Sequence, residues 1–144
     1  MTHKSPRIEA LLAAHAELPG FSRHYAGFFH CFNAQFYYEA HDVLEDIWLP
    51  IRGEAQADFY QGLIQMAGGF VLLQKQRLAP AARLFALALK NFEGYPARCD
   101  GIDLDAIREI CRRYRQDVID SGETQNPWSK ESAPQLALPT EDLR

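Results

Sequence analysis

The chain has 144 residues, of which 47% are hydrophobic and 24% charged, and its formal net charge is −4. This length fits one globular domain that buries about two-thirds of its unfolded surface. The acidic balance argues against nucleic acid as a partner, because phosphate binding needs a concentrated basic face.

The cysteines and the apolar runs indicate where the protein works. Cys31, Cys99 and Cys111 are odd in number and form no C-x-x-C pair, which is typical of a reducing interior. No run approaches the roughly 18 apolar residues of a membrane span. The first residues are not followed by a secretory apolar core. We therefore expect a cytoplasmic protein without a membrane partner.

The first third of the chain predicts a helix and then a helical hairpin. Ser5-Pro6 is typical of a helix start, and apolar residues follow at helical spacing to Leu18, before Pro19-Gly20. A second helix is predicted over residues 21–32. Asn33 tolerates a turn conformation, so we place a tight turn at residues 33–35 and a third helix after it.

The helix predicted over residues 36–49 carries most of the motif residues. Five residues fill one broad apolar arc of its wheel: Phe36, Ala40, Val43, Leu44 and Ile47. Tyr37 and Trp48 fall at the margin of this arc, and Glu39 falls at the opposite margin. Pro50 ends the helix.

His41 and Glu45 form a polar pair on the same helix. They are four residues apart, so both side chains leave the helix on nearly the same side. The wheel places His41 at least half buried and Glu45 at the boundary, whereas Asp42 and Asp46 point to water. The pair fits half of a metal or acid-base site, and it fits equally well a buried polar clasp between helices.

The rest of the chain predicts three more helices and no strand pairing. The run over residues 55–76 is apolar almost all round, which marks a central helix, with a polar stripe at Gln61 and Gln65. Its Gly68-Gly69 pair indicates close approach of another backbone or room for a side chain or ligand. Further helices are predicted over residues 81–94 and after a cap at Asp103. The fold class is all-α, a compact array of about six helices built from hairpins.

This pattern divides the chain into three parts. Residues 1–20 form an N-terminal helix packed on the core, residues 21–120 form the helical core, and residues 121–144 form an extended tail. Trp128 and the apolar residues 136–138 indicate that the tail packs along the bundle or on a partner, and a homodimer is one such arrangement.

The chain resembles the domain of unknown function 309 family over about residues 22–120. The resemblance depends on two motifs, Glu-Ala-His-x-x-x-Glu-x-x-Trp ending at Trp48 and Gln-Gly-Leu-Ile-Gln ending at Gln65. It continues through residues 81–89, Tyr95-Pro96 and residues 101–104. Gln35 departs from the family, whose members usually carry glycine there. The resemblance implies a small multihelical domain; the family has been labelled as metal-dependent hydrolases, and it implies no established activity.

Two chemical interpretations of the motif remain open. As metal ligands, His41 and Glu45 need a third protein ligand from another helix, because catalytic zinc usually takes three. As a hydrogen-bond cluster, they would meet Gln61 and Gln65 across a helix pair, which removes the penalty of burying four polar groups singly. A small-molecule pocket would use the same groups, with Tyr37 and Trp48 as its walls.

The leading hypothesis is a cytoplasmic helical protein that binds a small ligand or a partner at this cluster. The alternative is a hydrolase that uses a divalent metal held by His41 and Glu45. A second alternative is a tetratricopeptide-like module with a groove for a peptide, although fewer than three repeats fit the chain. Whether the protein is an enzyme stays open. A basic cluster at residues 112–115 is interpreted as a solvated helix face, and Cys31 is a poor nucleophile because it lies in an apolar helix.

Overall fold

Helix α4 (Ala57–Gln74) is the centre of the fold, as its apolar surface predicts. The computed structural model describes residues 5–14 and 17–144, and within them it contains six α-helices, which confirms the all-α prediction. The other five are α1 (Ser5–Ala13), α2 (Arg23–Asn33), α3 (Tyr37–Trp48), α5 (Leu78–Phe92) and α6 (Leu104–Asp120). Two short 3-10 turns, η1 (Leu49–Ile51) and η2 (Glu141–Leu143), follow α3 and end the tail. Among the described helices, none combines the length and apolarity that a bilayer crossing requires.

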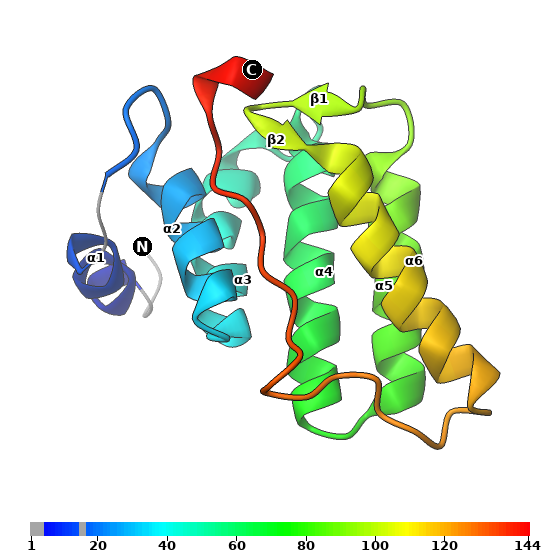
Figure 1. Cartoon of the computed structure of the whole chain (residues 1–144). Helices are drawn as coiled ribbons and strands as arrows, with labels where there is room; N and C mark the ends of the chain where they lie inside the picture. Colours follow the sequence, from blue (N-terminus) through cyan, green and yellow to red (C-terminus); the bar gives the residue numbers. More distant parts are fainter. Residues whose placement is uncertain (1–4, 15–16) are drawn as a thin grey trace.

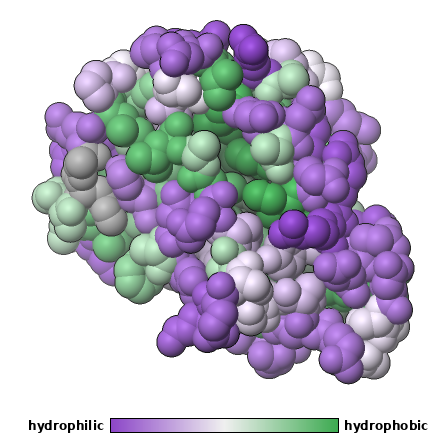
Figure 2. All heavy atoms as spheres, in the orientation of Figure 1, coloured by the Kyte–Doolittle hydropathy of each residue, from purple (hydrophilic) through white to green (hydrophobic). Residues whose placement is uncertain are grey.

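The helices form two layers (Figure 1). Helices α3, α4 and α5 lie side by side with α4 in the middle, α2 packs on α3, and α6 packs on α5. The tail runs between α2 and α6 and crosses α4 on the same face. Figure 2, in the same orientation, shows hydrophobic residues gathered in the upper middle of this face and a hydrophilic end where α6 passes into the tail.

Phe70 on α4 joins the helices into one core. Its ring centroid lies 5.3 Å from that of Phe32 on α2, 5.1 Å from those of Tyr37 on α3 and Phe85 on α5, and 4.9 Å from that of Tyr114 on α6. All five side chains are buried. Most of these pairs are edge-to-face, the arrangement that adds about 0.5–1.5 kcal/mol beyond area burial. The central helix therefore ties four others together through one aromatic side chain.

Glycines on α4 let α5 approach closely. A Cβ atom at Gly62 would lie 2.4 Å from the Phe92 ring, and one at Gly69 would lie 2.7 Å from the Phe85 ring. Each interior glycine costs about 1 kcal/mol of helix propensity relative to alanine. The aromatic packing that these glycines admit offsets this cost.

The turn between α2 and α3 lies where the sequence predicts it. The backbone N–H of Phe36 donates to the carbonyl of Cys31 and that of Gln35 donates to Phe32, at 2.8 and 2.9 Å. This is the Schellman pattern of a helix end, and its αL position is Gln35, with φ +67°. The chain thus keeps the turn although it lacks the usual glycine.

Three predictions about element boundaries are wrong. A two-stranded antiparallel hairpin, β1 (Arg98–Cys99) and β2 (Ile102–Asp103), occurs where no strand pairing was expected. Its turn residues Asp100 and Gly101 have φ of +49° and +81°, as a tight hairpin turn requires. Helix α1 ends at Ala13 instead of reaching residue 18; residues 15 and 16 of the predicted helix lie outside the described residues. Helix α5 begins at Leu78 instead of residue 81, because Pro80 is tolerated in a first turn.

The tail packs on the bundle of its own chain. The Asn126 side-chain amide donates to the carbonyl of Leu73 at 2.7 Å. Farther along, the Asn33 side chain accepts from the N–H of Leu136 at 2.7 Å and donates to its carbonyl at 2.8 Å. The tail therefore covers one face of α4.

Candidate functional site

Helix α3 brings three polar groups together at the predicted motif. His41 Nδ1 lies 3.2 Å from Asp42 Oδ1, and His41 Nε2 lies 3.9 Å from Glu45 Oε2. One ligand atom from each residue lies within 4.8 Å of the others. The side chains of His41 and Glu45 are 32% and 25% exposed, close to the partial burial that the wheel predicts.

The prediction that Asp42 points to water is wrong. Its side chain is 5% exposed and pairs with the guanidinium of Arg7. The cause is helix α1, which packs Ile8 and Leu12 on Val43, directly beside Asp42, and so covers this side of α3. The wheel of α3 alone could not show a helix that docks from elsewhere in the chain.

Asp46 is also less exposed than predicted. Its side chain is 23% exposed and lies 3.6 Å from His24 Nε2 on α2. The acidic side of α3 thus faces α1 and α2 instead of solvent, and His24 is turned to Asp46 rather than to His41.

The cluster of His41, Asp42 and Glu45 could hold a divalent cation. One imidazole nitrogen and two carboxylates are three protein ligands, the number usual in a catalytic zinc site, and they suit manganese as well. Asp42 would be the third ligand that the sequence did not reveal. The Arg7 guanidinium at Asp42 opposes a cation there, because it already neutralises that carboxylate.

The glutamines lie on a neighbouring stripe, and Gln65 has its partner on another helix. Gln61, Gln65, Gly68 and Leu72 are four partly exposed positions of α4, spaced as one helix face. The side-chain amide of Asn91 on α5 donates to Gln65 Oε1 at 2.6 Å. The hydrogen bond of Gln65 therefore joins α4 to α5, whereas the sequence placed it between α3 and α4. Nothing in the pattern of α5 had singled out Asn91.

Beside His41 the same face is hollowed into an apolar groove, which we call the Gly68 groove. It has a volume of about 200 Å³ and is lined by Tyr38, His41, Gly68, Val71, Leu72 and Leu84. Tyr38 is 57% exposed, and its ring lies parallel to that of His41 with the centroids 6.3 Å apart. A Cβ at Gly68 would lie 3.1 Å from a methyl of Leu84, so glycine here lets the Leu84 side chain come close to α4.

The other predicted site residues lie apart from this groove. Tyr37 is buried in the core, and its hydroxyl accepts a hydrogen bond from Trp128. Trp48 is partly buried at the end of α3, with the Arg52 guanidinium 5.7 Å from its ring centroid. Glu39 is on another side of α3, where its charge, after burial, helps to raise the pKa of Cys31. Tyr37 and Trp48 are thus not the walls of a common pocket with His41.

The thiols do not provide a nucleophile at neutral pH. Burial raises the pKa of Cys31 to about 11 and that of Cys111 to about 12. Burial also raises the pKa of Cys99. A thiol is reactive as its thiolate, so these groups behave as small core residues, in line with the prediction that Cys31 is a poor nucleophile.

Comparison with known proteins gives a family for the part of the chain that carries this site. Residues 25–84 match the family described as Domain of unknown function (DUF309). This segment is similar to DUF309 domains. The resemblance predicted from the sequence is confirmed over these residues, which include α3, α4, the His41 cluster and the Gly68 groove.

The chain is also similar to an uncharacterised protein of Aquifex aeolicus (strain VF5). The two are 28% identical over 98 residues, which are 68% of this chain and 28% of that protein. The chain therefore spans less than a third of the relative's length.

Proposed function

We propose that this protein is a binding protein whose Gly68 groove takes an apolar group of a small ligand or a partner. The observation that carries the proposal is the composition of the groove: five of its six lining residues are aliphatic, glycine or tyrosine, and the sixth is His41. Small-ligand sites are mostly apolar, with a few polar groups that fix orientation. His41 would supply that orienting hydrogen bond, and the exposed Tyr38 ring would cover the bound group.

Indole is a suitable probe, because it has an apolar ring and one N–H donor. Titration of ¹⁵N-labelled protein with indole should give saturable shifts at the amides of residues 38–41 and 68–72. Leu72→Gln should weaken this binding at least fivefold. Leu87→Gln is the matched control, since Leu87 is 46% exposed on α5 and does not line the groove. Shifts spread over the whole surface, or equal losses in both variants, would contradict the proposal.

A second candidate function is metal-assisted hydrolysis at His41, Asp42 and Glu45, favoured by the 4.8 Å grouping of their ligand atoms. A bound divalent cation would supply a metal-activated water. His41 and Glu45 would hold it, and Asp42 would join them by releasing Arg7. Metal analysis of protein purified without an affinity tag should then show one zinc or manganese per chain, lost in His41→Ala. If no stoichiometric metal is found, and added zinc or manganese does not raise the Tm, the hydrolase proposal is wrong.

We also propose that the protein works in the cytoplasm. What supports this is that Cys31, Cys99 and Cys111 are all free and buried thiols. Fractionation of cells that produce the protein, with thiol labelling after denaturation, should recover it in the cytoplasmic fraction with three labelled cysteines. Recovery with the membranes or outside the cell would refute this localisation.

A further inference from the structure

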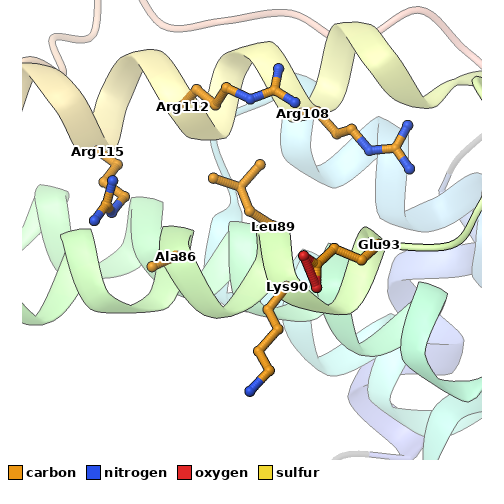
Figure 3. Close-up of a pocket in the computed structure, with 7 residues that line it drawn as sticks. All are labelled: Ala86, Leu89, Lys90, Glu93, Arg108, Arg112 and Arg115. Carbon is orange, nitrogen blue, oxygen red and sulfur yellow. The ribbon is translucent and has the colours of Figure 1, made fainter.

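A second hollow lies between α5 and α6, away from the His41 cluster, and we call it the arginine groove. Its volume is about 390 Å³, and α6 contributes Arg108, Arg112 and Arg115 to its lining. Their spacing of four and three residues puts the three guanidinium groups on one face of α6. Ala86 and Leu89 of α5 form an apolar floor, and Figure 3 shows Leu89 directed toward α6.

The first of these arginines has a structural role. One nitrogen of Arg108 donates to the carbonyls of Phe92 and Tyr95, each at 2.7 Å, and the other pairs with Asp105 at 2.7 Å. The Arg108 side chain is 14% exposed. It therefore holds the end of α5 to α6, and its charge is already compensated.

The other two arginines are available to a ligand. Arg112 pairs with Glu109 at 3.4 Å, but both side chains are more than half exposed, so this pair contributes little free energy. Arg115 is partly buried and forms no ion pair with any residue in the described part of the chain. In Figure 3 its guanidinium reaches from α6 toward α5. Figure 3 shows the Arg112 side chain lying along α6 toward Arg108, so the two guanidinium groups lie at different points along the same hollow.

The charges around them set the polarity of this space. Glu93 is the acidic residue in the lining, and Figure 3 shows it near the Arg108 end, whereas Lys90 extends away from α6. Next to the arginine groove lies a further hollow of about 430 Å³ that shares Arg112 and Arg115, adds Arg113 and Gln116, and also contains the carboxylates of Glu109 and Asp117. In the lining of the arginine groove itself, four basic side chains therefore stand against the one carboxylate of Glu93, on a chain whose net charge is −4.

We propose that the arginine groove binds an acidic peptide segment of a partner protein. Two carboxylates of the peptide would meet Arg112 and Arg115, because a guanidinium binds a carboxylate through two parallel hydrogen bonds. An apolar side chain of the peptide would lie on Leu89 and Ala86. The hollow is open and continues along α6 past Arg115, which suits an extended chain better than a compact anion. All seven residues that line this site lie outside residues 25–84, and none of them lines the Gly68 groove.

The test uses the full chain and a fluorescein-labelled peptide of six glutamates and two leucines, followed by fluorescence anisotropy. We expect saturable binding that weakens at least tenfold in Arg112→Glu/Arg115→Glu, since this double variant reverses both charges. Arg83→Glu on α5 is the control, because Arg83 is exposed and outside the groove. Arg83→Glu should change the Kd less than twofold. Repeating the titrations at higher salt, which screens long-range charge, shows how much of any change comes from net charge alone. Circular dichroism of each variant verifies the fold.

Three further outcomes decide the proposal. A peptide with serines in place of the two leucines should bind several-fold more weakly, and equal binding would remove the apolar floor from the proposal. No binding by the wild-type chain, or equal weakening by Arg83→Glu, would overturn it. If inorganic phosphate displaces the peptide at a lower concentration than unlabelled peptide does, the groove is a small-anion site and the peptide assignment is wrong.

Discussion

The indole Nε1 of Trp128 donates a hydrogen bond to the hydroxyl of Tyr37 at 3.1 Å, and the two rings meet edge-on with centroids 6.2 Å apart. Trp128 belongs to the tail, and Tyr37 belongs to the first turn of α3, 91 positions earlier in the chain. Through Tyr37, which stacks on Phe70, the tail reaches the aromatic core. The tail is therefore part of the folded unit, although it contains no α-helix.

Removing this contact should destabilise the protein. We expect Trp128→Phe to lower the free energy of unfolding by about 1 kcal/mol, because one hydrogen bond is lost while most of the ring packing stays. Trp128→Ala should cost about 2–4 kcal/mol, since the packing of a large aromatic is also lost. Urea unfolding measures both. A double-mutant cycle with Tyr37→Phe should return a coupling of at least about 0.5 kcal/mol, and a coupling of zero would mean that the hydrogen bond contributes nothing.

Asn33 provides a second anchor for the tail. It donates to and accepts from the backbone of Leu136, so Asn33→Ala removes two hydrogen bonds and should cost about 2 kcal/mol. Hydrogen exchange gives the local readout: the amide of Leu136 should lose protection, whereas amides of α4 should change only by the global loss of stability. Gln135→Ala is the control, because Gln135 is exposed and bonds the Asn33 carbonyl from the surface. If both substitutions have the same effect, Asn33 has no special role.

Gln35 occupies the αL position of the turn after α2, with φ +67°. A non-glycine residue there is strained by about 1 kcal/mol. We expect Gln35→Gly to raise the free energy of unfolding by up to about 1 kcal/mol, measured by thermal or urea unfolding. The gain is reduced by the loss of the exposed hydrogen bond that the Gln35 side chain donates to the carbonyl of Lys130. Gln116→Gly, in the middle of α6, should cost about 1 kcal/mol instead. A loss of stability in Gln35→Gly would show that its side chain matters more than its backbone conformation.

Periodicity located the helices because each one buries a continuous stripe, and it failed where burial depends on distant parts of the chain. Asp42 is the main example: the wheel of α3 turned it to water, but α1 docks there and supplies Arg7. Phe36 shows the reverse error, because the wheel predicted that it is buried. It lies at the helix start and is 54% exposed. Its neighbour Tyr37, which the wheel placed at the margin, is buried in the core instead.

The sequence predicts other parts of the fold and of the site to different degrees. The hairpin at residues 98–103 was signalled by Asp100-Gly101, a typical hairpin turn pair, but its strands are too short to show alternation. The bond between Gln65 and Asn91 had no signal, because two amides 26 positions apart reveal nothing of their pairing. The His41 and Glu45 pair was predictable since the spacing of four residues fixes it locally.

The buried tyrosines should make the stability of the protein fall at alkaline pH. Burial raises the pKa of Tyr37 to about 12, and burial together with Asp100 does the same for Tyr60, whereas tyrosine in an unfolded chain has a pKa of about 10. The folded state therefore binds more protons than the unfolded state between about pH 10 and 12. The stabilisation is complete below pH 10 and is lost as the pH rises through 12.

Urea unfolding between pH 8 and 11, with tyrosinate absorbance at each pH, measures this dependence. The buried thiols contribute in the same direction, because burial also raises their pKa values. The informative comparison is therefore Tyr37→Phe against the wild type. The decline with pH should be shallower in the variant, and parallel curves would show that Tyr37 ionises normally in the folded protein.

Gly68 and Gly69 are adjacent on α4 and should respond oppositely to alanine. A Cβ at Gly69 would lie 2.7 Å from the Phe85 ring in the core, so Gly69→Ala should cost about 1–3 kcal/mol through overpacking. At Gly68 the nearest atom is a methyl of the partly exposed Leu84 at 3.1 Å, which can move. Gly68→Ala should therefore leave stability unchanged or raise it by up to about 1 kcal/mol, through helix propensity.

The same pair separates folding from binding. Gly68→Ala partly fills the Gly68 groove, so indole binding should weaken in a protein that is at least as stable as the wild type. Gly69→Ala should keep the affinity for indole at temperatures where the variant is folded, because Gly69 faces Phe85 and not the groove. Urea unfolding and NMR titration of both variants give the four values required. If Gly68→Ala binds indole as tightly as the wild type, glycine at this position serves the packing of α4 on α5. The proposal that Gly68 makes room for a ligand would then be wrong.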